Sequence, residues 1–129
     1  MADITRLVDT SILVDYLRGK LTAERWLDNF APGELGISVV TAVELMAGCE
    51  NLREQNRLEK DLAAYPVVWV SNAISATAWE WYCQYRLGDG VGFFDCVIAA
   101  SAHHLGVPVC TLNEKHFRPF PGTKVERPY

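Results

Sequence analysis

The sequence lacks the cysteine pattern of a disulfide-stabilised or zinc-binding protein. Its cysteines are widely spaced, with no C-x-x-C pair and no histidine at the interval of a zinc ligand. They are Cys49, Cys83, Cys96 and Cys110. We therefore interpret them as small core residues of a protein that works in a reducing compartment.

Long apolar segments are also missing. No uncharged run approaches the roughly 20 residues that a membrane-spanning helix needs. The first residues do not combine a basic segment with a following apolar one, as a secretory signal peptide does. We expect a soluble, cytoplasmic protein that makes no contact with a membrane.

Positive charge is scarce. The chain has 16 acidic and 12 basic residues, which gives a net charge of −4. This balance excludes a protein that holds nucleic acid by bulk charge alone. If a metal ion occupies three of the carboxylates, −4 + 3 leaves −1 on the rest of the surface. A local basic patch and a bound cation could then meet a polyanion.

Two common catalytic arrangements are absent from the sequence. There is no Ser-His-Asp or Cys-His arrangement at a nucleophile elbow. The glycine-rich segment 88–92 differs from the G-x-x-x-x-G-K-[ST] loop and follows no predicted strand, so it is a weak candidate for nucleotide binding. We interpret it as a hinge.

What the sequence does contain is a regular alternation of strand and helix patterns. Apolar, often β-branched runs predict strands at 4–8, 35–40, 67–70, 107–112 and 124–126. Apolar residues at helical spacing predict helices at 10–17, 22–30, 41–48, 51–65, 73–87 and 93–102. The alternation predicts one α/β domain, residues 1–129, with helices around a central, mainly parallel sheet of four to five strands.

Polar side chains recur at the junctions between these elements. They are Asp9, Glu44, Asp95 and Asn113, all at or just after the start of a predicted helix or turn. Because the strand-to-helix turns of a parallel sheet lie on one edge, we expect the four to converge there, with no basic residue among them. Carboxylates held together repel one another unless a proton or a cation intervenes.

Such a cluster predicts metal chemistry. Oxygen ligands at strand ends favour Mg²⁺ or Mn²⁺, which keep several waters and accept a substrate phosphate. The ion lowers the pKa of a bound water, and the resulting hydroxide attacks phosphorus in line. We therefore expect hydrolysis of a phosphate ester.

Two of these residues also have a purely structural interpretation. Asp9 stands where a helix N-cap accepts hydrogen bonds from free N–H groups. Thr41-x-x-Glu44 matches a capping box, in which the glutamate reaches back to the N–H of the cap residue. Taken alone, the Asp9 stretch favours capping, and only the recurrence of such corners downstream favours a site.

Taken as motifs, the same residues resemble a known family. The motifs are Val8-Asp9-Thr10-Ser11, Ser38-x-x-Thr41-x-x-Glu44-Leu45-x-x-Gly48, Asp95-x-x-Ile98-Ala99-Ala100 and Thr111-x-Asn113-x-x-His116-Phe117. They look like those of PIN-domain ribonucleases, most closely the VapC toxins of toxin-antitoxin pairs, and they cover essentially the whole chain in order. The resemblance implies a three-layer α/β/α PIN-like fold and Mg²⁺- or Mn²⁺-dependent endonucleolytic cleavage of RNA. It also implies a homodimer and neutralisation by a cognate VapB-type antitoxin.

The resemblance assigns roles by motif position. Asp9, Glu44 and Asp95 are implied as metal-binding catalytic carboxylates, and Asn113 as the fourth catalytic position. A hydrogen bond from Thr10 or Ser11 is expected to orient Asp9.

The fourth position departs from the plainest acidic pattern. Asn113 stands where many PIN domains have aspartate, and His116 stands where an acid is frequent in these toxins. An amide oxygen can still bind a metal or position a water, but it adds no negative charge. The departure therefore questions a second metal ion more than it questions activity. Glu114 is a candidate substitute, and the sequence leaves the choice among Asn113, Glu114 and His116 open.

Three surfaces are candidates for partners. A groove between the helices at 10–17 and 22–30, bordered by Leu17 and Trp26, would suit an amphipathic antitoxin segment. The aromatic-rich helix at 73–87 would suit a dimer interface. RNA phosphates could meet basic residues near the predicted edge, namely Arg18, Lys20, Lys115 and Arg118.

Two other interpretations stay open at this stage. A catalytically decayed PIN-like module that binds RNA or protein would explain the missing acid at position 113. A phosphatase with an aspartate nucleophile would also place Asp9 after its first strand, but that chemistry uses D-x-D, and Ser11 fills the second acidic position.

Overall fold

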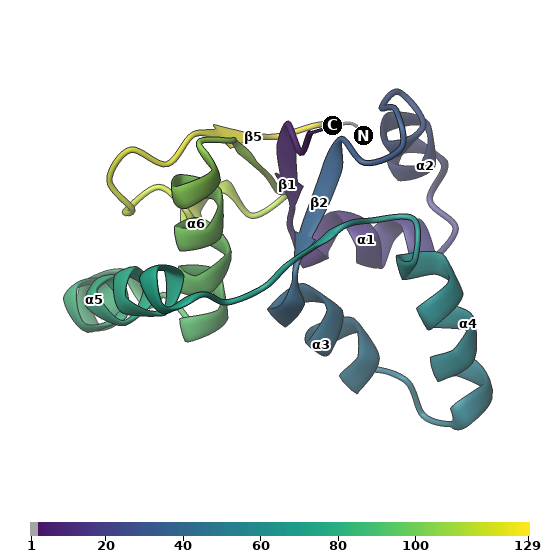
Figure 1. Ribbon diagram of the computed structural model, residues 1–129, viewed down its shortest axis with the longest axis horizontal. Helices are drawn as coiled ribbons and strands as arrows, with labels where there is room; N and C mark the ends of the chain where they lie inside the picture. Colours follow the sequence, from purple (N-terminus) through teal and green to yellow (C-terminus); the bar gives the residue numbers. More distant parts are fainter. Residues whose placement is uncertain (1–2) are drawn as a thin grey trace.

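The computed structural model describes residues 3–129 and contains a central sheet with helices on both sides (Figure 1). The strands are short, with bounds β1 Arg6–Val8, β2 Leu35–Ser38, β3 Val67–Val68, β4 Val109–Cys110 and β5 Val125–Glu126. The helices are α1 Thr10–Leu17, α2 Leu21–Leu27, α3 Val39–Ala47, α4 Leu52–Leu62, α5 Asn72–Asp89 and α6 Phe93–Leu105, with a 3₁₀ turn, η1, at Glu114–His116.

The five strands lie in the order β3-β2-β1-β4-β5, and every neighbouring pair is parallel. The first strand of the chain is therefore the central one. Parallel strands need crossover connections, and the helices between β1, β2, β3 and β4 supply them. The prediction of a parallel sheet of four to five strands flanked by helices is confirmed, and the layers are those of a three-layer α/β/α PIN-like fold.

The two faces of the sheet belong to two separate apolar cores. Successive side chains of a strand point to opposite faces, and accordingly Leu7 joins one cluster while Val8 joins the other. The Leu7 cluster contains buried residues of α5 and α6, and the Val8 cluster contains buried residues of α1, α2 and α4. Figure 1 shows α5 and α6 on one side of the strands and α1, α2 and α4 on the other.

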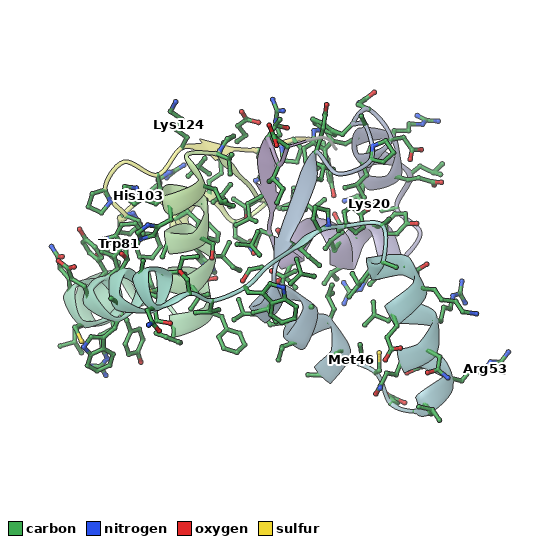
Figure 2. The ribbon with its side chains drawn as sticks, in the orientation of Figure 1. Lys20, Met46, Arg53, Trp81, His103 and Lys124 are labelled. Carbon is green, nitrogen blue, oxygen red and sulfur yellow. The ribbon has the colours of Figure 1, made fainter. Side chains whose placement is uncertain are left out.

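Aromatic side chains pack against one another on the side of the sheet that α5 and α6 cover. Trp81 of α5 contacts His103 of α6 edge-on, with ring centroids 5.5 Å apart. Figure 2 labels both residues on the same side of the sheet. Trp81 also stacks on Phe120 at 5.1 Å. The imidazole at the end of α6 therefore has a packing role, which agrees with its place in the last turn of that helix.

Several element boundaries differ from the predicted ones. The strand predicted at 107–112 covers only Val109–Cys110, and the strand predicted at 67–70 ends at Val68. Helix α5 continues through Gly88 and Asp89 and ends at Gly90, whose φ of 66° is left-handed. The segment interpreted as a hinge is thus partly helical, and Gly90 is its helix-ending residue.

The helices also bear on membrane contact. Within residues 3–129, no helix is both long enough and apolar enough to span a bilayer.

Candidate active site

The carboxyl ends of the strands form a rim, and the predicted polar residues follow these strand ends or stand near the starts of the adjoining helices. Register places Asp9, which follows β1, level with Ser38 at the end of β2 and with Thr111 after β4. The first turns of α1 and α3 leave this rim directly, because α1 begins one residue after β1 and α3 directly after β2. Residues separated by a hundred positions in the chain are therefore neighbours here.

Asp9 is held by side-chain hydroxyl groups and not by backbone N–H groups of the helix that follows it. Its side chain is 5% exposed. The Oδ2 atom accepts a hydrogen bond of 2.7 Å from Thr111 Oγ1 and one of 3.1 Å from Ser11 Oγ. Asp9 occupies the N-cap position of α1, yet its side chain makes no capping hydrogen bond. The capping interpretation of Asp9 is wrong, because its bonded oxygen serves Ser11 and Thr111.

The hydroxyl group of Thr10, at the start of α1, contacts both Thr41 and Glu44 of α3. Thr10 Oγ1 donates to Glu44 Oε1 at 3.0 Å and lies 3.3 Å from Thr41 Oγ1. Of the two residues expected to orient Asp9, Ser11 therefore makes that hydrogen bond and Thr10 serves Glu44.

The capping-box interpretation of Thr41 and Glu44 is also wrong. Helix α3 begins at Val39, and its cap is Ser38, whose hydroxyl accepts from the Val40 N–H at 3.2 Å. Thr41 is fully buried inside the helix, and Glu44 stands on its exposed side in the second turn. Glu44 therefore does not cap α3, and its carboxylate is available at the rim.

Asp95, in the first turn of α6, is electrostatically coupled to the other acids. Burial raises the pKa of its carboxyl group above the ordinary value, and the charge of Asp9 raises it further, with a smaller contribution from Glu44. His116 and the backbone N–H of Gly92 act in the opposite direction. Both other carboxylates therefore disfavour the ionised form of Asp95.

His116 is the basic neighbour of this acid. Its Nδ1 lies 3.6 Å from Asp95 Oδ2, and its side chain is half exposed. The expectation that no basic residue stands among the acids is therefore wrong. His116, in η1, lies next to Asp95 at the start of α6.

Asn113 sits on a segment whose backbone is fixed from several sides. Its N–H donates to Thr111 Oγ1 at 2.9 Å, and the N–H of Leu112 donates to Ser11 Oγ at 3.1 Å. The side chain of Asn113 is exposed. Glu114, the candidate substitute, has a basic partner in Arg127, whose Nη1 lies 4.0 Å from its Oε1.

The carboxylates are near one another but are not gathered into a finished metal site. Within residues 3–129, no three side chains of His, Cys, Asp or Glu lie close enough to form a set of ligands. Like charges repel at short range, and the hydrogen bonds of Asp9 fix only that acid. Glu44 is exposed and accepts one hydrogen bond, from Thr10, and the candidate donor set of Asp9, Glu44 and Asp95 is all oxygen.

A groove of about 760 Å³ opens beside the rim. It is lined by the end of α1, by α3 and by α4, and Glu24 is its one lining residue from α2. Leu17 and Glu44 both line it, whereas Trp26 instead packs edge-on against Phe30 at 5.0 Å. The groove predicted between the first two helices is thus displaced towards α3 and α4.

Among the predicted phosphate contacts, two have other surroundings. Lys20 pairs with Asp15 at 3.5 Å and lies over the ring of Tyr129, and Arg18 lines the groove. Lys115 and Arg118 are exposed around η1.

Sequence reasoning named Thr111 within a motif but gave it no role, and it missed Arg127. Arg127 donates from Nη1 to the carbonyl of Leu112 at 3.1 Å and from Nε to the carbonyl of Tyr129 at 3.2 Å. For Thr111 a signal existed, since it follows β4 as Asp9 follows β1. For Arg127 there was none, because its contact depends on how the last strand ends.

Comparison with known proteins bears on this site. A PIN-domain family model matches residues 6–120. Ribonuclease VapC10 of Mycobacterium tuberculosis is 34% identical over 116 residues, which cover 88% of this chain and 86% of that protein. Ribonuclease VapC of Rickettsia bellii is 27% identical over 129 residues, which cover 92% of each.

Solved structures share the arrangement. A toxin-antitoxin complex from Klebsiella pneumoniae gives a TM-score of 0.80 at 28% identity, over 97% of this chain and 98% of that one. The DNA-bound VapBC of Salmonella typhimurium gives 0.83 at 24% identity, over 98% and 99%, a likeness of fold.

Proposed function

This chain belongs to the PIN-domain family, and on that premise we propose that it is a metal-dependent endoribonuclease, the toxin of a toxin-antitoxin pair. The family match over residues 6–120 and the VapC relatives support a ribonuclease. The observation that carries the proposal is geometric: Thr111 after β4 donates to Asp9, and Thr10, the residue after Asp9, donates to Glu44 of α3, so acids from distant segments lie at one rim.

The chemistry of the donors fits a hard divalent cation. The raised pKa of Asp95 reflects burial beside other negative charges, and a cation relieves that repulsion directly. Asp9, Glu44 and Asp95 would hold Mg²⁺ or Mn²⁺, which prefer such oxygen ligands. When bound, the ion lowers the pKa of a water and stabilises the charge that develops on phosphorus.

Three hydroxyl groups hold two of the proposed metal ligands in place. Ser11 and Thr111 both donate to Oδ2 and hold Asp9 in one orientation, and its second oxygen, Oδ1, accepts no side-chain hydrogen bond from the described residues. Thr10 holds Glu44 against the rim. Outer hydrogen bonds of this kind typically change metal affinity or activity by about 10–100-fold.

The fourth position is the least acidic part of the site. Asn113 and His116 add no negative charge, and Glu114 is near Arg127. We propose that three carboxylates hold a single metal ion, with the amide of Asn113 positioning a water.

The antitoxin is proposed to occupy the groove beside the rim. Its lining includes Glu24, Glu44, Glu54 and Asp61 against Arg18 and Arg57, an acidic balance of four to two. An amphipathic segment with basic residues therefore fits it. Because Glu44 belongs to both groove and rim, a segment lying in the groove would reach the metal ligands.

Other expectations remain predictions. They are a homodimer formed through α5, a single domain over residues 1–129 and a cytoplasmic location. The exposed Trp79 and Leu87 of α5, at 63% and 83%, support the choice of dimer surface.

The proposed function is tested by sequencing the 5′ ends of RNA cut by the purified protein. We expect cuts that need Mg²⁺ or Mn²⁺, that stop on adding EDTA and that disappear in Asp9→Asn. Asp89→Asn removes one exposed carboxylate at the end of α5 and is the matched control, for which we expect normal cutting. Full activity in Asp9→Asn would place the site elsewhere.

The alternative is a decayed module that binds RNA or protein without cutting it, and the missing acid at Asn113 favours it. Thermal unfolding with added Mn²⁺ separates the two. An active site gains stability in proportion to metal binding, whereas a decayed site shows neither Mn²⁺-dependent stabilisation nor cleavage.

A further inference from the structure

Near the rim, Trp69 is more exposed than the two aromatic residues that open α6, Phe93 at 42% and Phe94 at 40%. Trp69 directly follows β3, and it is 70% exposed. Trp81, by contrast, is 7% exposed in the core. Aromatic rings gain much from burial, so an indole left in solvent beside a catalytic rim needs a partner to explain it.

The sheet register fixes where Trp69 lies. Val68 pairs with Ser38, and Asp9 is level with Ser38 on the next strand. Neighbouring strands are roughly 4.8 Å apart, so the end of β3 lies on the order of 10 Å from Asp9. In Figure 1 the connection from β3 to α5 crosses the end of β2 where α3 begins. The distance from Trp69 to a phosphate bound at the acids therefore corresponds to the length of a few nucleotides.

Charge alone is a poor source of RNA affinity in this protein. The net charge is −4, and the acids at the rim repel phosphates until a cation is bound. Single-stranded nucleic acid is also held by stacking of its bases on aromatic side chains, which does not depend on charge. A solvent-exposed indole at the rim supplies that contact.

We propose that Trp69 is a stacking platform for a base of single-stranded RNA that flanks the cleaved phosphate. The inference rests on the proposed ribonuclease function and adds to it a residue that contacts the base beside the cleaved phosphate. A second copy of the chain is the competing occupant, but the exposed Trp79 and Leu87 of α5 offer it a separate apolar surface.

The test measures binding of a fluorescent single-stranded RNA of mixed sequence to the full chain. Asp9→Asn serves as background, so that the strand stays intact. Adding Trp69→Ala is expected to weaken binding by about tenfold, the effect of losing one stacked base. Trp69→Phe keeps a ring and is expected to restore most of the affinity, whereas a purely structural role would not distinguish Phe from Ala in this way.

The matched control is Trp79→Ala, which removes the other strongly exposed tryptophan, at 63%. We expect it to leave RNA affinity unchanged. A strand with one abasic nucleotide sharpens the test: at the stacked position, the abasic change and Trp69→Ala should not add, because both remove the same contact.

Three outcomes would overturn the proposal. They are unchanged affinity in Trp69→Ala, an equal loss in Trp79→Ala, or dissociation of an oligomer by Trp69→Ala in sedimentation, which would assign the residue to a second copy. In each case the parent protein would still cut RNA, so the proposed function stands. If the parent neither cuts nor binds RNA, both proposals fail.

Discussion

Asp9 and Asp95 sit at the same rim but are held in opposite ways. Asp9 is 5% exposed and accepts two hydroxyl hydrogen bonds on one oxygen. Asp95 is less buried, has a raised pKa and has a histidine 3.6 Å away as its nearest basic group. The first is fixed by the protein, whereas the second is left in unfavourable surroundings that a cation would improve. A metal site can thus combine one rigid acid with one that gains from binding.

The largest effect on this comparison is expected from Asp95→Asn. Cleavage should fall by more than about 100-fold, since a proposed ligand matters more than the bonds that support it. Without metal, however, the variant should be more stable than the parent at neutral pH. The raised pKa means that the folded state binds the Asp95 proton more tightly, so ionised Asp95 opposes folding.

Because the pKa of Asp95 is raised, the stability difference between variant and parent depends on pH. The advantage of Asp95→Asn should be present above the folded pKa of Asp95 and should shrink as pH falls through it towards the ordinary value of 3.8. Thermal unfolding in EDTA across this range measures it. If the variant is less stable than the parent at pH 7, then the protein holds the Asp95 carboxylate favourably, as it holds that of Asp9.

Thr111→Val should have the next largest effect. It removes the 2.7 Å donor of a buried carboxylate and should cost about 1–3 kcal/mol in the free energy of unfolding. Cleavage should fall by about 10–100-fold. Thr41→Val is the matched control, because Thr41 is equally buried but bonds another hydroxyl. Denaturant unfolding and cleavage rates compare the two, and equal losses would refute a special role for Thr111.

Ser11→Ala should act in the same direction but less strongly. Its bond to Asp9 is longer, at 3.1 Å, and Thr111 remains to hold the acid. We expect a loss of cleavage below that of Thr111→Val, and a double variant whose losses do not add, since both hydroxyls act on Oδ2. Additive losses would mean that Ser11 works mainly through the N–H of Leu112.

The smallest effect is expected from Tyr129→Phe. Its hydroxyl donates to Asp15 at 2.9 Å, on the outer side of α1 and away from the two acids. Cleavage should change by less than about twofold, and stability by about 1 kcal/mol or less. A strong loss of cleavage, measured against unchanged unfolding, would show that the contact of residues 127–129 with Leu112 also shapes the rim.

The order of elements and the parallel sheet follow from the sequence because strand and helix periods alternate clearly. The site residues also follow in part, since Asp9, Glu44 and Asp95 stand at junctions and match family motifs. Their hydrogen bonds do not. Asp9 looks like a helix cap locally, but its side chain instead bonds Ser11 and Thr111, and Thr111 is 102 positions away. Likewise, Thr41 and Glu44 imitate a capping box because Ser38, the real cap, is three residues earlier.

The bond between Asp9 and Thr111 has a consequence during synthesis. Asp9 leaves the ribosome early, but the hydroxyl that holds it is made 102 residues later. A growing chain thus carries every acidic ligand before it carries the group that fixes the first of them. The orientation of Asp9 that we propose for metal binding is therefore completed only after the strand that precedes Thr111 has been made.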